Sequence, residues 1–167
     1  FLDGHALRTE DEQKANEIGA LLPEVTRLAK RDTVVVDACC GKGALSIAIA
    51  QELGVEVRGI EHNGALVERA RFAASKCDVA VSFSASAIEA AVLPRGSVVV
   101  ALHACGGATD ATIDRAIDAD ARAMLLVPCC YAGGAKHGDA TSTLAVPAQS
   151  IADRWRTELP LPEHGLV

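Results

Sequence analysis

The chain has 167 residues, half of them apolar, and a formal net charge of −6 at pH 7. This length and apolar share predict a folded domain with a real core and exclude intrinsic disorder. No stretch approaches the roughly 20 apolar residues of a membrane helix. The opening sequence "FLDGHALRTEDEQK" also lacks the basic-then-apolar order of a signal peptide. We therefore expect one cytoplasmic domain over residues 1–167, without a membrane partner.

The composition also limits the nucleic acid surface that the chain offers by itself. Phosphate binding needs clustered Lys and Arg, and base stacking needs aromatic rings. The chain is negative overall and has only three Phe, one Tyr and one Trp. A nucleic acid substrate would therefore need a local basic patch, or a partner chain that supplies substrate binding.

The first predicted element is an amphipathic helix over about residues 10–29. Its apolar side chains fall on one side, and Pro23 is a point at which the helix can bend. We expect this N-terminal helix to cover the first layer of a sheet. The apolar side chains are Ile18, Leu21, Leu22, Val25 and Leu28.

Strand-like and helix-like segments then alternate along the chain. Short β-branched and apolar runs bounded by turn residues are typical of buried parallel strands, and the segments between them have helical spacing. This alternation predicts a doubly wound α/β sheet. The expected strands are 33–36, 55–60, 79–83, 97–102 and 123–127, and the expected helices are 44–53, 64–75, 87–92 and 109–119. After residue 127 only one more helix, over 149–158, is indicated.

The turn after the first expected strand holds the main candidate for a ligand site. In open α/β sheets the ligand lies beyond the carboxyl ends of the strands, and here Asp37 and the loop Gly41–Gly43 occupy that place. A dinucleotide fingerprint puts its first glycine directly after the strand, whereas here an acid and three more residues intervene. A carboxylate repels pyrophosphate and attracts a cation. S-adenosylmethionine carries an amino group and a sulfonium, so it fits this acid.

The second expected strand ends in "GIEHN". Glu61 lies 20 residues after Gly41, where an acid accepts hydrogen bonds from the ribose hydroxyls of an adenosine. With its neighbour His62 it is a candidate cofactor-binding residue. The spacing fits either NAD or S-adenosylmethionine and does not decide between them, and a strand-end acid can also serve only to cap the following helix.

Four sequence patches carry a resemblance to a known family. The segments "VVDACCGKG" and "GIEHN" resemble the first and second motifs of the class I S-adenosylmethionine-dependent methyltransferases. The patches "KANEI", "ACCGKG", "LHACGGATD" and "VPCC" are similar to one branch, which includes the eukaryotic tRNA ribose methyltransferase of the acceptor stem and the methyltransferase-like domain attached to a glutathione-transferase-like module. The resemblance implies a Rossmann-like, mostly parallel sheet with strand order 3-2-1-4-5 and S-adenosylmethionine as cofactor. The sequence pattern shows no sixth and seventh strand, so we expect either a compact variant with reduced C-terminal strands or a missing segment.

The resemblance also implies roles for individual residues. Asp37, Gly41 and Gly43 would hold the methionine portion of the cofactor, and Glu61 its ribose. Two positions depart from the family pattern. Cys39 stands where the family commonly has the first glycine of the motif, and Ser86 stands near the position of an Asp that lies close to the adenine.

Three residues are candidates for the reaction itself. His103 follows the fourth expected strand and could act as a general base or contact the cofactor, since imidazole titrates near neutrality. It could equally be a buried ring that is hydrogen-bonded to the backbone. Asp110 could act on the substrate, although an Asp at a helix start is more often a cap. Tyr131 could stack on a substrate or close the rim of the core.

Five cysteines follow the first, fourth and fifth expected strands, and we expect them to be free thiols that converge. We favour their interpretation as small apolar side chains that let the cofactor approach. A zinc site is less favoured because adjacent cysteine pairs lack the spacing of common sites, and a nucleophilic thiol is the third alternative. These cysteines are Cys39, Cys40, Cys105, Cys129 and Cys130.

The sequence therefore predicts an S-adenosylmethionine-dependent methyltransferase. Because of the resemblance, RNA, and tRNA in particular, is preferred over a small molecule as methyl acceptor. The alternatives are an NAD-dependent oxidoreductase, or a partner subunit that binds a cofactor or a metal without catalysis.

Overall fold

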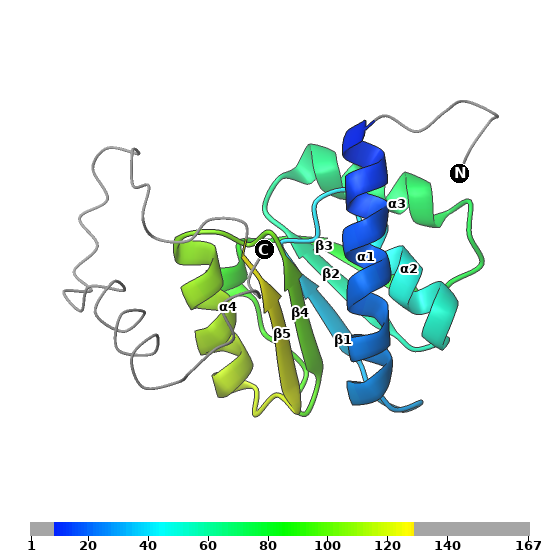
Figure 1. Cartoon of the computed structure of the whole chain (residues 1–167). Helices are drawn as coiled ribbons and strands as arrows, with labels where there is room; N and C mark the ends of the chain where they lie inside the picture. Colours follow the sequence, from blue (N-terminus) through cyan, green and yellow to red (C-terminus); the bar gives the residue numbers. More distant parts are fainter. Residues whose placement is uncertain (1–8, 129–167) are drawn as a thin grey trace, which may run out of the picture. The chain divides into compact units, whose positions relative to one another are not determined.

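A computed structural model describes residues 9–128 of the chain (Figure 1). Within them, five parallel strands form one sheet in the order β3-β2-β1-β4-β5, which confirms the predicted α/β fold and strand order. The strands are β1 (Val35–Ala38), β2 (Val57–Glu61), β3 (Val81–Ala85), β4 (Val98–Leu102) and β5 (Ala123–Val127). The helices are α1 (Thr9–Leu28), α2 (Ala44–Leu53), α3 (Gly64–Ala74) and α4 (Gly107–Asp118), with a 3-10 turn η1 (Ile88–Ala90).

The central strand β1 explains why the apolar run in the sequence is continuous. It pairs with β2 and with β4, so that Val35 lies opposite Val57 and Val98. All four of its residues are buried. A parallel strand that is covered on both faces favours β-branched apolar side chains at nearly every position.

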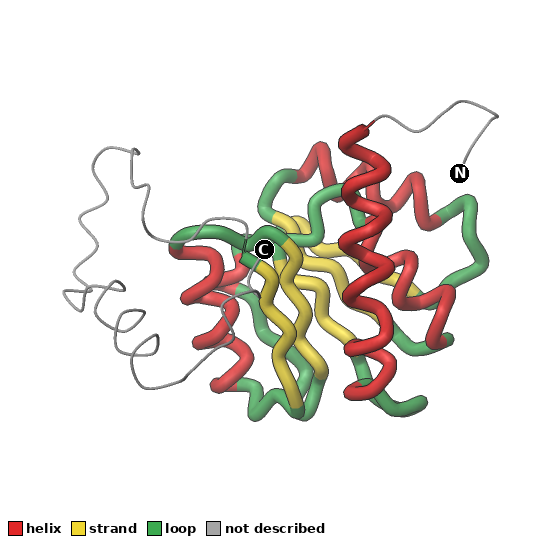
Figure 2. The backbone as a smooth tube through the Cα atoms, in the orientation of Figure 1, coloured by secondary structure: helices red, strands yellow, loops and turns green. Residues whose placement is uncertain are grey.

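Helices cover the two faces of the sheet (Figures 1 and 2). On one face α1, α2 and α3 pack on the strands, and on the other face α4 packs on β4 and β5. Successive strand residues point to opposite faces, so Val35 joins the core under α1 and α2 while Val36 joins the core under α4.

Helix α1 lies along one face of the sheet, and its N-terminal end extends past the edge at which the strands end (Figure 1). Its buried side chains Ile18, Leu21 and Val25 pack in the core with α2 and β4. Pro23 lies inside the helix on its exposed side. This agrees with the sequence-based expectation of an N-terminal helical cover.

Several details of the predicted elements were wrong. The second strand, expected over 55–60, is Val57–Glu61, and the third, expected over 79–83, is Val81–Ala85. The segment 87–92 was expected to be a helix, but it makes only the single turn η1, after which the backbone is extended at Ala91. The first strand is shifted toward Asp37, which pairs within the sheet opposite Gly59 and Val100. A buried strand tolerates this acid because Ser46 of α2 donates a hydrogen bond to it.

The expected helix over 149–158 lies outside the described residues. The expectation of a single domain over 1–167 also extends beyond them and stays a prediction. Within residues 9–128, no helix is both long enough and apolar enough to cross a membrane.

Candidate functional site

A cavity of about 420 Å³ lies where β1 and β4 end. Its walls come from α1, the loop between β1 and α2, the start of α2 and the residues at the end of β4. We call it the β1–β4 cavity. It is lined by Asp11, Lys14, Asp37, Cys39, Cys40, Gly41, Lys42, Ala44, Leu45, Leu102 and His103.

The glycine loop forms one wall of this cavity, and its two glycines differ in what they do. Both have a positive φ, of 56° at Gly41 and 77° at Gly43. A Cβ on Gly41 would meet no atom within 4 Å, so its backbone faces open space that a ligand can enter. A Cβ on Gly43 would lie 2.6 Å from the ring of Phe83. Gly43 is therefore required for packing, and it does not line the cavity.

Asp37 lies at the bottom of the site and is only 1% exposed. Its Oδ2 accepts a hydrogen bond of 2.6 Å from the Ser46 hydroxyl. Burial raises the pKa of Asp37 to about 7, against the opposing effect of this hydrogen bond. A cation in the cavity would favour the ionised carboxylate, so this acid is suited to a positively charged ligand.

Glu61 organises the loop from the neighbouring strand. It is 5% exposed, and its Oε2 accepts a hydrogen bond of 3.1 Å from the Gly41 N–H. Its Oε1 accepts a bond of 2.8 Å from the Asn63 N–H and lies 2.9 Å from His62 Nδ1. A carboxylate has four acceptor positions, so Oε2 keeps capacity for one further hydrogen-bond donor. His62 itself is 79% exposed and is not part of the cavity wall.

His103 lines the cavity at the end of β4 and has a positive φ of 68°. Its Nε2 lies 2.7 Å from Oε2 of Glu17 in α1. Its Nδ1 is buried and has no hydrogen-bond partner, which costs about 1–3 kcal/mol for a polar atom without compensation. The other interpretation of His103, a ring satisfied by the backbone, does not fit this orphaned nitrogen.

The sequence analysis missed the contribution of α1 to the site. The buried stripe Val25, Leu21 and Ile18 continues at helical spacing to Lys14 and Asp11, which both line the cavity. A buried helix face that changes from apolar to charged residues was a detectable signal, because a face that only packs stays apolar. Glu17 lies one residue from this stripe, and the hydrogen bond with His103 lowers its pKa below the usual value.

The structure separates two other candidates from the β1–β4 cavity. Asp110 is exposed in the first turn of α4 and does not line the cavity. An acid there interacts favourably with the helix dipole. Ser86 follows β3 and lines a second cavity instead. Tyr131 lies outside the described residues.

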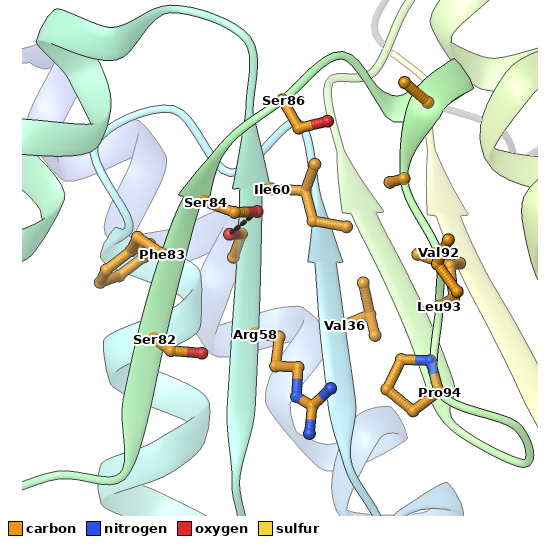
Figure 3. A pocket seen from close by; sticks show the side chains of 13 residues that line it. Val36, Arg58, Ile60, Ser82, Phe83, Ser84, Ser86, Val92, Leu93 and Pro94 are labelled. Atoms are coloured by element: carbon orange, nitrogen blue, oxygen red, sulfur yellow. Dashed lines mark hydrogen bonds between the residues drawn. The ribbon is translucent and has the colours of Figure 1, made fainter.

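The second cavity, of about 460 Å³, lies over β2 and β3 (Figure 3). It exists because η1 is too short to cover that part of the sheet. Arg58, Ser82 and Ser84 are exposed on this face, while Phe83 points to the opposite, covered face (Figure 3). The polar wall of this second cavity is expected, because successive residues of a strand point to opposite faces and one face of β3 is exposed to solvent here.

The two adjacent cysteines point to different parts of the core. Cys39 packs with the cluster around Val36, and Cys40 packs with the cluster around Phe83, although both also line the β1–β4 cavity. Burial raises the pKa of both thiols above the usual value. They are thus protonated, which agrees with small core side chains and not with a nucleophile.

Cys105 is not part of a disulfide bond, and Cys129 and Cys130 lie outside the described residues. In the described part of the chain no three His, Cys, Asp or Glu side chains form a group that could hold a metal ion.

Comparison with known proteins identifies the family. Residues 12–136 match the family described as "Methyltransferase domain". Over 120 residues the chain is 34% identical to a "Glutathione S-transferase C-terminal domain-containing protein" of Xenopus laevis and 31% identical to its Homo sapiens counterpart. These matches cover 71% of the chain but only 19% of each relative, so the chain spans about a fifth of their length.

Solved structures share the fold at low sequence identity. The S-adenosylmethionine-dependent methyltransferase SibL matches with a TM-score of 0.52 and 23% identity, over 65% of this chain and 33% of that one. A SAM-dependent methyltransferase from Geobacter sulfurreducens in complex with S-adenosyl-L-homocysteine matches with a TM-score of 0.50 and 18% identity, over 60% and 43%. The chain therefore belongs to the methyltransferase-domain family and has the fold of class I S-adenosylmethionine-dependent methyltransferases.

Proposed function

We propose that this domain binds S-adenosylmethionine in the β1–β4 cavity and transfers its methyl group to RNA, with tRNA as the first candidate acceptor. The observation that carries the proposal is the buried Asp37 carboxyl group, which lines the cavity beside the open Gly41 backbone. An acid in this place favours a cationic ligand over a diphosphate. It therefore argues against the alternative of an NAD-dependent oxidoreductase.

The residues present fit this cofactor. Asp37 can pair with its positively charged groups, and the Gly41 backbone lets it approach closely. The cavity volume of about 420 Å³ lies in the range of small-molecule sites. When bound, S-adenosylmethionine would supply a methyl group on a positively charged sulfur. The lone pair of an acceptor can attack this methyl carbon directly, with the sulfur as leaving group.

Glu61 is proposed to accept a hydrogen bond from the ribose of the cofactor. Its Oε2 has one acceptor position left beside the Gly41 N–H, and it lies at the carboxyl end of the strand next to β1. The same carboxylate thus shapes the loop and reads the ligand. The adjacent His62 is paired with Glu61, but its side chain is exposed and does not line the cavity. We therefore assign it a smaller part in cofactor binding than Glu61.

His103 is the proposed catalytic residue of the described part of the chain. Alignment of acceptor and methyl group supplies most of the rate, and a base is needed only if the acceptor must lose a proton. His103 lines the cavity and has a ring nitrogen without a partner, whereas Asp110 lies away from the cavity.

RNA as acceptor is supported by the sequence resemblance. The charges of the cavity wall do not favour RNA by themselves, because Lys14 and Lys42 are accompanied by Asp11 and Asp37, and the whole chain has a net charge of −6. Because the chain spans about a fifth of the length of its relatives, further RNA contacts would come from other segments or a partner chain.

The test is methyl transfer from labelled S-adenosylmethionine to total RNA and, in parallel, to a small-molecule extract. Label in the tRNA fraction supports the proposal. Label only in the small-molecule extract overturns RNA as acceptor and leaves the methyltransferase intact. Titration calorimetry with S-adenosylhomocysteine gives the second readout, and we expect one site.

Two variants make the binding test specific. Asp37→Asn removes the negative charge and keeps the shape of the side chain, so the affinity for S-adenosylhomocysteine should fall at least tenfold. Asp32→Asn is the matched control, since Asp32 is exposed in the turn before β1. Equal affinities of the two variants would contradict the assignment of Asp37. Binding of NAD with no response to S-adenosylhomocysteine would favour an oxidoreductase.

A further inference from the structure

We propose that Glu17 of α1 is a positioning residue that holds His103 as the proton acceptor of methyl transfer, with Nδ1 as the accepting atom. This inference rests on the proposed function. It assigns a role to a helix that precedes the sheet and joins two residues that are 86 positions apart in the chain.

The hydrogen bond between the two side chains determines which ring nitrogen is free. Glu17 Oε2 and His103 Nε2 are 2.7 Å apart, and an ionised carboxylate can only accept a hydrogen bond. Nε2 must therefore carry the hydrogen. In a neutral imidazole ring the lone pair then lies on Nδ1, which is the nitrogen that can take up a proton.

Nδ1 is available because nothing else uses it. It is buried and has no hydrogen-bond partner, although His103 lines the β1–β4 cavity. A buried polar atom without a partner is uncommon in a folded protein, so it points to a role that a bound substrate completes. Because Nδ1 is buried, the acceptor reaches it only when the atoms that cover it move.

The backbone around His103 supports the same assignment. His103 and Cys39 both have a positive φ, of 68° and 59°, and both line this cavity. Such conformations are unfavourable for residues other than glycine, and they gather at functional sites. The His103 N–H donates to the Val127 carbonyl at 2.9 Å, which fixes the backbone that carries the ring.

Glu17 is held so that it can stabilise a positively charged ring. Gln13 donates a hydrogen bond of 3.0 Å to its other oxygen, and Lys14 Nζ lies 4.0 Å from Oε2. The hydrogen bond with His103 lowers the pKa of Glu17 below its usual value. The carboxylate is therefore ionised near neutral pH, where it faces the His103 ring.

The proton balance follows from this pairing. As a lone pair of the acceptor atom forms a bond to the methyl carbon, the carbon–sulfur bond of the donor would break and S-adenosylhomocysteine would leave with that electron pair. The hydrogen of the acceptor atom leaves as a proton and binds to Nδ1. The ring then carries one positive charge beside the negative Glu17, so the pair is neutral. The proton passes to water when the product leaves, which restores the ring.

Other charged and ionisable groups face the same cavity and contribute to any pH dependence. They come from α1, from β1 and from the loop after β1. They are Asp11, Lys14, Asp37, Cys39, Cys40 and Lys42. A comparison between variants with these groups unchanged isolates the effect of Glu17.

The first experiment is nitrogen NMR of the full chain, which reads the hydrogen positions on the His103 ring without any acceptor. At about pH 8, where a free imidazole is neutral, the wild-type ring should have its hydrogen on Nε2 alone. Glu17→Gln keeps this state because the amide oxygen still accepts, whereas Glu17→Ala gives a mixture of both forms. A hydrogen on Nδ1 in the wild type, or an unchanged ring in Glu17→Ala, would overturn the proposal.

The second experiment measures the pH profile of kcat with the acceptor fraction identified by the labelling test above. Glu17→Gln should lower kcat by about 10- to 100-fold and move the acid limb of the profile to lower pH, because the positively charged ring loses its counter-charge. Adding Glu17→Gln to His103→Asn should cause no further loss. Glu12→Gln, an exposed acid of the same helix, is the matched control and should behave as the wild type.

The outcomes separate this inference from the proposed function. If the wild type fails to bind S-adenosylhomocysteine, the proposed function is wrong. If Glu17→Gln and Glu12→Gln bind it equally and also have the same kcat and the same acid limb, only the role of Glu17 is overturned. Equal affinity with a shifted acid limb in Glu17→Gln supports it.

Discussion

Glu61 Oε2 accepts a hydrogen bond of 3.1 Å from the N–H of Gly41, which joins the end of β2 to the loop after β1. The other oxygen, Oε1, accepts from the N–H of Asn63, the N-cap of α3. One buried carboxylate therefore fixes both the glycine loop and the start of the next helix. The ribose contact proposed for Glu61 would depend on this structural role, since the loop and the acid are held in one geometry.

Replacing Glu61 by Gln should destabilise the fold as well as the cofactor site. The amide has one accepting oxygen, so one of the two backbone N–H groups would face an NH₂ group instead. Leaving a buried N–H without a partner costs about 1–3 kcal/mol, and we expect this decrease in the free energy of unfolding. Urea denaturation measures it, and calorimetry with S-adenosylhomocysteine should show weaker binding.

Glu56→Gln is the matched control for this prediction. Glu56 directly precedes β2, and its exposed side chain pairs with Arg58. An exposed pair of this kind contributes about 0–1 kcal/mol. Similar losses in the two variants would contradict the structural role of Glu61.

The stability of the protein should depend on the ionisation of Asp37. Burial raises the pKa of Asp37 to about 7, from its usual value of 3.8. Between these two values the folded state keeps a proton that the unfolded state has lost, so stability falls as the pH rises. Asp37→Asn removes this effect. The difference in unfolding free energy between variant and wild type should thus grow by about 2–3 kcal/mol from pH 5 to pH 8.

Urea denaturation of both proteins at the two pH values checks this sign. Ser46 can still donate its hydrogen bond to the Asn oxygen, so the comparison isolates the charge. A difference that shrinks with rising pH would mean that the carboxyl group is stabilised as an anion in the folded state. If Asp37→Asn also loses affinity for the cofactor, as proposed above, the charge of Asp37 serves cofactor binding and lowers the stability of the fold.

The fold was predictable from the sequence because buried parallel strands and amphipathic helices have different periods. The helix Ala44–Leu53 and the strand Ala123–Val127 have the bounds that the pattern predicted. The helix expected over 87–92 failed for a tertiary reason. Ile88 in this segment and Leu93 directly after it are buried, but an extended segment after one 3-10 turn buries them as well as a helix would.

The residues of the candidate site were predictable from the sequence only where they directly follow a strand. The acid, the glycine loop and Glu61 lie next to strand ends, so sequence order indicates their position. Glu17 and Lys14 reach the site from α1. No local sequence pattern predicts on which strands this helix packs, so their place in the site could not be predicted. The contact between Glu17 and His103 is therefore a property of the packing of α1 on the sheet and not of either segment.

Cys39 offers a test of the backbone at the end of β1. Its φ is 59°, a conformation that costs a side-chain-bearing residue about 1–2 kcal/mol relative to glycine. Cys39→Gly should therefore leave the unfolding free energy unchanged or raise it, and it should keep the affinity for S-adenosylhomocysteine. Cys39→Val should lower the unfolding free energy, since a β-branched side chain is least tolerated there. A loss of cofactor binding in Cys39→Gly would give the thiol itself a role.

Gly41 and Gly43 allow backbone strain to be separated from steric overlap. Both have a positive φ, so Ala at either position is strained by about 1–2 kcal/mol. Only at Gly43 does the new Cβ overlap the core, at 2.6 Å from Phe83 and 2.9 Å from Ala70. Gly43→Ala should therefore lose about 1–3 kcal/mol more than Gly41→Ala in urea denaturation.

Gly41→Ala should instead lose affinity for S-adenosylhomocysteine, because its methyl group occupies the open space beside the loop. Equal stability losses, or full cofactor binding by Gly41→Ala, would contradict the division between a packing glycine and a ligand-facing glycine.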